Sequence, residues 1–114
     1  MIERHGRTPI MHRIVEHNGV LYVGGMIADD RSVSMQGQVE QILQKLAGLL
    51  TPLGSSKEKV LAATIYVTDL AQKAGLNTAW TAFFGDALPT RATIGVADLG
   101  SAETLVEIVF TATR

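Results

Sequence analysis

The chain contains no cysteine, only three prolines, and no hydrophobic run that approaches the roughly 20 residues needed to cross a bilayer. Without cysteine, a disulfide framework, a thiolate nucleophile and a thiolate metal site are all excluded. Its ten basic and eleven acidic residues nearly cancel, so the chain lacks the basic face that binds a nucleic acid backbone. The polar N-terminus also lacks the apolar segment of a secretory signal. We therefore expect a cytoplasmic protein that binds neither nucleic acids nor membranes.

The composition fits one globular domain. The 114 residues are 46% hydrophobic and 18% charged, without an internal repeat, a low-complexity tract or a linker. A chain of this length buries about two-thirds of its unfolded surface, which is enough for one hydrophobic core. We therefore expect residues 1–114 to form a single domain.

A hairpin is the clearest local signal in the first quarter of the chain. Asn18-Gly19 is the dipeptide best suited to the positive φ angles of a tight turn, and apolar residues flank it on both sides. This pattern predicts antiparallel strands over residues 12–17 and 20–26. The residues before them form a polar tail in this interpretation.

Two helices and three more strands are predicted after the hairpin. Apolar residues at three- and four-residue steps from Met35 predict an amphipathic helix that begins after Ser34 and ends at Pro52-Leu53-Gly54. A β-rich segment follows over residues 59–70. A second helix carries its aromatic residues on one side and ends before Gly85. The last two strands are expected over residues 91–98 and 104–113.

The predicted order is β-β-α-β-α-β-β, which indicates an α+β fold with one mixed sheet and both helices on one face. Such a sheet leaves its other face without a covering layer. Strand alternation places four apolar side chains there: Leu61, Ile65, Leu105 and Val109. A large exposed apolar face usually marks an interface, so we expect an oligomer.

Arg91 stands out because it begins an otherwise apolar strand. Alternation separates Arg91 and Thr93 from Ala92 and Ile94. If the bulkier residues of the last two strands pack under the helices, Arg91, Thr93 and Glu107 share the uncovered face. Buried charges there must be paired or bound to a ligand. From the residues alone, a structural salt bridge between Arg91 and Glu107, across the sheet or across a subunit interface, is the simpler interpretation, and a binding site is the alternative.

Other candidate sites are weaker. His5, His12 and His17 do not have the spacing of a metal-binding pair on a helix, so no metal site is expected. No nucleophile elbow of the Gly-x-Ser-x-Gly type is present. Gly24-Gly25 follows a strand but precedes no helix, which favours a bulge or a close approach of a ligand to the backbone over a phosphate-binding turn.

Several segments together resemble the RidA (YjgF/YER057c/UK114) family. "PTRATIGVADL" followed by "LVEIVF" is similar to the signature of that family. "LYVGGMIAD", "ATIYVTDL" and "LNTAWTAFFGD" support the resemblance, which covers about residues 12–114 in the same order.

The resemblance implies a chorismate-mutase-like α+β fold and a homotrimer whose sheets line a central barrel, with clefts between subunits. It also implies an imine/enamine deaminase that needs no cofactor and converts compounds such as 2-aminoacrylate to 2-keto acids and ammonia. In that family the position of Arg91 binds the substrate carboxylate, and the position of Glu107 places or activates water. Asn77 then lies near the cleft, and Gly24 and Thr93 line the pocket.

The chain departs from the family pattern at three positions. Gly24 replaces a serine, Thr93 replaces a cysteine, and Met11 or His12 stands where the family has a tyrosine. These changes remove hydroxyl and thiol groups but keep the arginine. A second interpretation therefore remains open: a non-catalytic trimer that binds small ketoacids or amino acids as a sensor or regulator.

Overall fold

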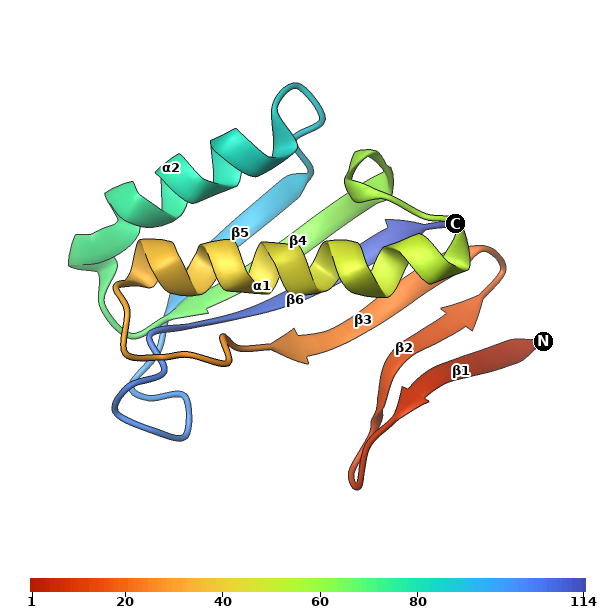
Figure 1. Ribbon diagram of the computed structural model, residues 1–114, viewed down its shortest axis with the longest axis horizontal. Coiled ribbons are helices and arrows are strands. Elements are labelled where there is room, and N and C mark those ends of the chain that lie inside the picture. Colours follow the sequence, from red (N-terminus) through yellow and green to blue (C-terminus); the bar gives the residue numbers. More distant parts are fainter.

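A computed structural model describes residues 1–114 as one six-stranded mixed sheet with two helices packed on the same face (Figure 1). The strands lie in the order β1-β2-β3-β6-β4-β5, and only β4 and β5 are parallel. The elements are β1 (Ile2–Arg7), β2 (His12–His17), β3 (Val20–Met26), α1 (Met35–Leu50), β4 (Val60–Val67), α2 (Lys73–Phe84), β5 (Thr90–Gly95) and β6 (Val106–Thr113). This architecture confirms the predicted α+β class and both predicted helices.

The predicted element order lacked one strand. Residues 2–7, expected as a polar tail, form β1, which pairs antiparallel with β2 at the edge of the sheet. Most side chains of β1 are exposed. An edge strand of this kind forms by backbone hydrogen bonds and carries no apolar alternation, so the usual sequence signal of a strand is missing.

The predicted turn and helix ends are confirmed. Asn18 and Gly19 have φ angles of 52° and 77°, as the hairpin turn between β2 and β3 requires. The Ser34 hydroxyl accepts a hydrogen bond from the backbone N–H of Gly37 at the start of α1. Gly85, with φ of 57°, ends α2.

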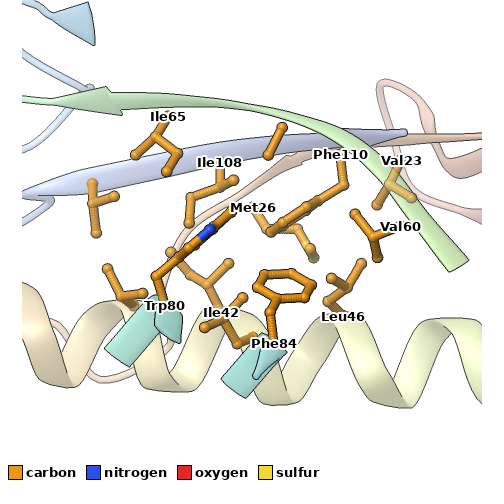
Figure 2. Close-up of a cluster of buried hydrophobic side chains, with 14 of the residues drawn as sticks. Val23, Met26, Ile42, Leu46, Val60, Ile65, Trp80, Phe84, Ile108 and Phe110 are labelled. Carbon is orange, nitrogen blue, oxygen red and sulfur yellow. The ribbon is translucent and has the colours of Figure 1, made fainter. Parts of the chain in front are cut away.

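The hydrophobic core lies between the helices and the sheet (Figure 2). The predicted inward residues of β6 are all buried there: Val106, Ile108, Phe110 and Ala112. Trp80 of α2 stacks on Phe110 with ring centroids 6.0 Å apart and contacts Phe84 at 4.8 Å. The aromatic stripe of α2 is therefore part of the core, and the second helix is held against the sheet by ring packing.

The open face, meaning the sheet face that α1 and α2 leave uncovered, differs in part from the prediction. Val109 is half-buried on it, but Ile65 is completely buried under the helices and Leu105 also packs against the core. A bulge at Leu61 explains the error for Ile65, because β4 slips register between Val60 and Ala62 and alternation restarts there. The open face stays apolar through Tyr22, Ile94 and Val109.

Gln38 is the buried polar side chain that joins α1 to two loops. Its amide nitrogen donates to the carbonyls of Val33, at 3.1 Å, and Glu103, at 3.0 Å, and lies 3.4 Å from that of Arg31. Its amide oxygen accepts from the backbone N–H of Leu105 at 3.1 Å. One fully buried side chain thereby satisfies backbone groups that no helix or strand pairs. None of the helices combines the length and hydropathy of a membrane-spanning segment.

Candidate functional site

Arg91 and Thr93 point toward the helices. In the parallel pairing of β4 with β5, Arg91 is the partner of Ala63 and Thr93 is the partner of Ile65. Paired residues of neighbouring strands project from the same face of a sheet, and both β4 residues are buried under the helices. The prediction that Arg91 and Thr93 face away from the helices is therefore wrong.

Glu107 lies on the other side of the sheet. It is flanked along β6 by Val106 and Ile108, which are fully buried under the helices, so its own side chain projects from the open face. Its partner across β4 is Tyr66. Arg91 and Glu107 thus occupy opposite faces and form no ion pair. The simpler interpretation of the sequence, a salt bridge between them, is therefore wrong within one chain, and its form across a subunit interface stays a prediction.

The error has its origin in the position of β5 at the sheet edge. The bulkier side chains of a strand mark its buried side only where the hydrophobic core lies against that side of the strand. Ala92 and Ile94 instead project from the open face, where Ile94 is 43% exposed. The register with β4 decides which way β5 faces, and a single strand does not reveal that register.

The candidate site residues form two groups. The first, which we call the Arg91 half-site, consists of Arg91, Thr93, Asn77 and Trp80. The Nε of Arg91 donates to the Thr93 hydroxyl at 2.9 Å, and its Nη2 donates to the Asn77 amide oxygen at 2.6 Å. The guanidinium carbon lies 5.4 Å from the centre of the Trp80 ring. The structure thus brings together three residues from β5 and α2 that the resemblance assigned to one site, and it adds Trp80.

The guanidinium of Arg91 carries an uncompensated charge. Partial burial lowers its pKa below the ordinary value of an arginine, yet the group keeps its proton at neutral pH. No carboxylate lies within 4.0 Å of it. A partly desolvated guanidinium whose partners are all neutral is suited to an external anion, and its fork of donors matches a carboxylate.

The second group, the Glu107 half-site, consists of Glu107, Gly25, Gly24 and Met11. Gly24 and Gly25 form the bulge that the sequence suggested, because β3 has two residues between Val23 and Met26 where β6 has one. A β-carbon at Gly25 would collide with Oε2 of Glu107. Glycine at this position therefore leaves the room in which the carboxylate lies against the backbone.

Two departures from the family pattern meet at Gly24. A β-carbon there would lie 3.2 Å from the sulfur of Met11, the nearest side chain. The thioether of Met11 thus occupies space beside the position where the family carries a serine. Met11 itself is one of the two candidates for the missing tyrosine, and His12 begins β2.

Glu3, His5 and Glu16 form a cluster whose ligand atoms lie within 4.8 Å of one another. The Arg114 guanidinium already holds Glu16, with Nη1 at 2.9 and 3.0 Å from its two oxygens, and His5 lies 3.2 Å from the first. Hydrogen bonds from Arg114, and less strongly from His5, hold the pKa of Glu16 below its ordinary 4.5 although burial opposes the shift. The sequence analysis did not predict this network, because Glu3 and His5 lie on β1, a strand that the sequence did not predict.

None of the chain's four principal grooves joins the two half-sites. A groove of about 680 Å³ runs along α1 and α2, and none of the site residues predicted from the sequence lines it. Another groove, beside the turn between β1 and β2, includes Met11 and His12 but neither Arg91 nor Glu107. Within one chain, the Arg91 guanidinium and the Glu107 carboxylate therefore lie on different faces of the sheet and share no groove.

Comparison with known proteins yields one consistent group. A family model described as "Endoribonuclease L-PSP" matches residues 7–114. A RutC family protein of Haemophilus ducreyi is 31% identical over 113 residues, covering 98% of this chain and 96% of that protein.

Solved structures agree over the whole length. A protein of Pseudomonas aeruginosa (33% identity, 100% of this chain and 99% of that one) superposes with a TM-score of 0.94. A member of the YjgF protein family from Neisseria meningitidis (30% identity, 100% and 95%) gives the same TM-score. These structures confirm the chorismate-mutase-like fold that the resemblance implied.

Proposed function

The chain belongs to the RidA (YjgF, L-PSP, RutC) family. Because many members of this family are enamine/imine deaminases, we propose that the chain hydrolyses reactive 2-imino and 2-enamino acids. 2-Aminoacrylate is an example, and the products are a 2-keto acid and ammonia. The observation that carries the proposal is the uncompensated Arg91 guanidinium, held by neutral partners beside a buried indole ring. Such a group suits a ligand with one carboxylate.

The site is composite and forms where two copies of the chain meet. The side chains of Arg91 and Glu107 project from opposite faces of the same sheet. A small substrate therefore contacts both residues only when the two residues belong to different copies of the chain. The apolar open face with Tyr22, Ile94 and Val109 supports association. A homotrimer, as the resemblance implies, brings the Arg91 half-site of one copy to the Glu107 half-site of the next.

The chemistry needs only positioning and one proton acceptor. Arg91 binds the carboxylate and thereby fixes the adjacent C=N carbon, which is already electrophilic. A 2-enamino acid enters this step after its β-carbon takes up a proton from solvent, which gives the protonated imine, C=NH2+. Glu107 accepts a proton from water while the water oxygen bonds to the imine carbon and the C=N π electrons move to nitrogen, which gives a neutral carbinolamine. The protonated Glu107 returns the proton to the nitrogen, the C–N bond breaks to release ammonia as the hydroxyl oxygen forms the C=O bond, and loss of the hydroxyl proton leaves the 2-keto acid. No metal, cofactor or covalent intermediate takes part.

Subunit complementation tests both the residues and their placement. Arg91→Ala and Glu107→Gln are each expected to be inactive on a 2-imino acid generated by an amino acid oxidase. When the two variants are co-expressed in equal amounts, about one site in four combines an intact Arg91 with an intact Glu107 from neighbouring copies. Activity should therefore return to about a quarter of the wild-type value, a fraction that follows from random mixing.

The control is co-expression of Arg91→Ala with the double variant Arg91→Ala/Glu107→Gln, which leaves no intact pair and should stay inactive. If the first mixture also stays inactive although mixed oligomers form, the composite site is wrong. If Arg91→Ala alone keeps full activity, the proposed mechanism is wrong.

A non-catalytic ligand sensor is the second candidate, and one observation favours it: neither Gly24, which precedes the glycine that Glu107 contacts, nor the adjoining Met11 carries a hydroxyl. A sensor would be stabilised thermally by small ketoacids without accelerating imine hydrolysis. An enzyme would accelerate hydrolysis above the rate without protein, and this comparison separates the two functions.

We do not propose RNA cleavage for this chain, although the family model that matches it is described as an endoribonuclease. The net charge is −1, and a phosphate backbone requires several converging cations. Cytoplasmic location stays a prediction of the sequence.

A further inference from the structure

We infer that Thr93 and Asn77 act as positioning residues, which hold the guanidinium of Arg91 so that its Nη1 side meets the ligand's carboxylate. The inference rests on the proposed function, in which Arg91 binds a carboxylate. The resemblance assigned Thr93 and Asn77 to substrate binding. In the structure, the oxygen atom of each side chain is directed at Arg91 instead.

The hydrogen bonds leave a defined set of free donors. A guanidinium has five N–H groups, one on Nε and two on each terminal nitrogen. Thr93 takes the Nε group and Asn77 takes one group on Nη2. Both groups on Nη1 and one on Nη2 remain without a partner in the chain. A carboxylate that forms two parallel hydrogen bonds must therefore approach the terminal nitrogens and not the Nε side.

Both anchors are uncharged, and this matters for binding. A hydroxyl and an amide oxygen fix the orientation of the guanidinium without neutralising it, whereas an aspartate or glutamate in either position would compete with the ligand. Trp80 supports one face of the group at 5.4 Å. Because the side chain is ordered before the ligand arrives, less conformational entropy is lost on binding.

The two anchors come from different elements, so neither alone determines the orientation. Thr93 lies two residues along β5 from Arg91, on the same side of the strand. Asn77 is exposed on α2 and reaches Arg91 from above the sheet. The guanidinium therefore bridges the edge strand and the helix that covers it, and movement of either element would turn it.

Substitutions at Thr93 test the inference with a matched pair. Thr93→Val keeps the branched shape but loses the acceptor, whereas Thr93→Ser keeps the acceptor. We expect Thr93→Val to raise the Kd for 2-ketobutyrate, and the KM for the imino acid, about tenfold because one hydrogen bond to a charged group is lost. The kcat should change little, and Thr93→Ser should restore both constants. Unchanged binding by Thr93→Val, or failure of the serine variant to restore it, overturns the inference.

Substitutions at Asn77 give an independent test, in which a negative charge is added beside Arg91 instead of a hydrogen-bond acceptor being removed. Asn77→Asp retains an acceptor but places a carboxylate on Arg91, so it should weaken 2-ketobutyrate binding more than Asn77→Ala does. A merely structural role predicts the reverse order, because aspartate resembles asparagine more closely than alanine does. If Asn77→Asp binds 2-ketobutyrate as well as the wild type, the inference is wrong.

A readout without ligand separates this inference from the proposed function. The Nε–H of Arg91 should give a slowly exchanging signal in a ¹H–¹⁵N spectrum, identified by its loss in Arg91→Lys, and exchange should accelerate in Thr93→Val. Turnover that depends on Arg91 but not on Thr93 contradicts only the positioning role. Failure of the wild type both to bind 2-ketobutyrate and to accelerate imine hydrolysis contradicts the proposed function, and the carboxylate role of the Nη1 side fails with it.

Discussion

Glu107 holds its carboxylate against the α-carbon of Gly25, in the space that a β-carbon would fill. The two residues lie on neighbouring strands at the Gly24-Gly25 bulge of β3. Glycine is thus needed at position 25 because a β-carbon there would collide with the Glu107 carboxylate. This requirement does not depend on any ligand. It also makes the position of the carboxylate sensitive to a single methyl group.

Gly25→Ala should lower activity without unfolding the protein. The added methyl displaces the end of the flexible Glu107 side chain, which costs little stability but moves the proton acceptor. We expect kcat for imine hydrolysis to fall about tenfold or more, with the urea midpoint nearly unchanged. Gly48→Ala is the matched control, since its β-carbon on α1 meets no other atom within 4 Å. Equal kcat values for the two variants would contradict the role given to Glu107.

Gln38→Leu should strongly destabilise the fold. The substitution preserves much of the side-chain volume but leaves the N–H of Leu105 and the carbonyls of Val33 and Glu103 without partners. We expect a loss of about 2–4 kcal/mol in the free energy of unfolding, measured by urea denaturation. Gln44→Leu, on the exposed side of the same helix, should change it by less than about 0.5 kcal/mol. Similar effects of both variants would show that the buried amide network does not stabilise the loops.

Glu16 should make stability depend on acid pH. Its pKa is lowered in the folded chain, chiefly by the hydrogen bonds from Arg114. The stabilisation is therefore complete above the ordinary value of 4.5 and is lost as the pH falls through the lowered value. Glu16→Gln should reduce the urea midpoint clearly at pH 7 and much less at pH 3. Glu40→Gln, an exposed carboxylate without an ion pair, should show no such pH-dependent difference.

Val109→Lys should prevent association of the chains. Val109 projects from the open face opposite the bulge, so an interface there would have to bury an ammonium group in place of an apolar side chain. We expect the dissociation constant of the oligomer to rise at least about 100-fold, measured by light scattering over a dilution series. Val33→Lys, in the loop before α1, should leave the oligomer intact. A monomeric wild type would contradict the proposed interface.

Local patterns in the sequence predicted local structure well. The Asn18-Gly19 turn, the Ser34 cap and the Gly85 stop depend on backbone angles and hydrogen bonds that a few neighbouring residues determine. The inward side of β6 was also predicted, because its bulky residues alternate without interruption. The signature around Arg91 indicates the family from the sequence alone, and that membership is confirmed.

Predictions that needed the relation between strands failed. The face of β5 was assigned from bulk, but its register with β4 turns Arg91 toward α2. The bulge at Leu61 reversed the expected side of Ile65. No residue inside either strand encodes such a register, since hydrogen bonds between strands and the packing of distant helices select it.

The sequence by itself determined the elements after residue 11, the two helix ends, the family and the candidate residues, because those features depend on short-range chemistry and on a long shared motif. Only the tertiary structure decided that β1 exists, and that Thr93 and Asn77 hold Arg91. It also decided that Arg91 and Glu107 lie on opposite faces of one sheet. These outcomes depend on pairings between residues far apart in the chain, which a one-dimensional pattern leaves open.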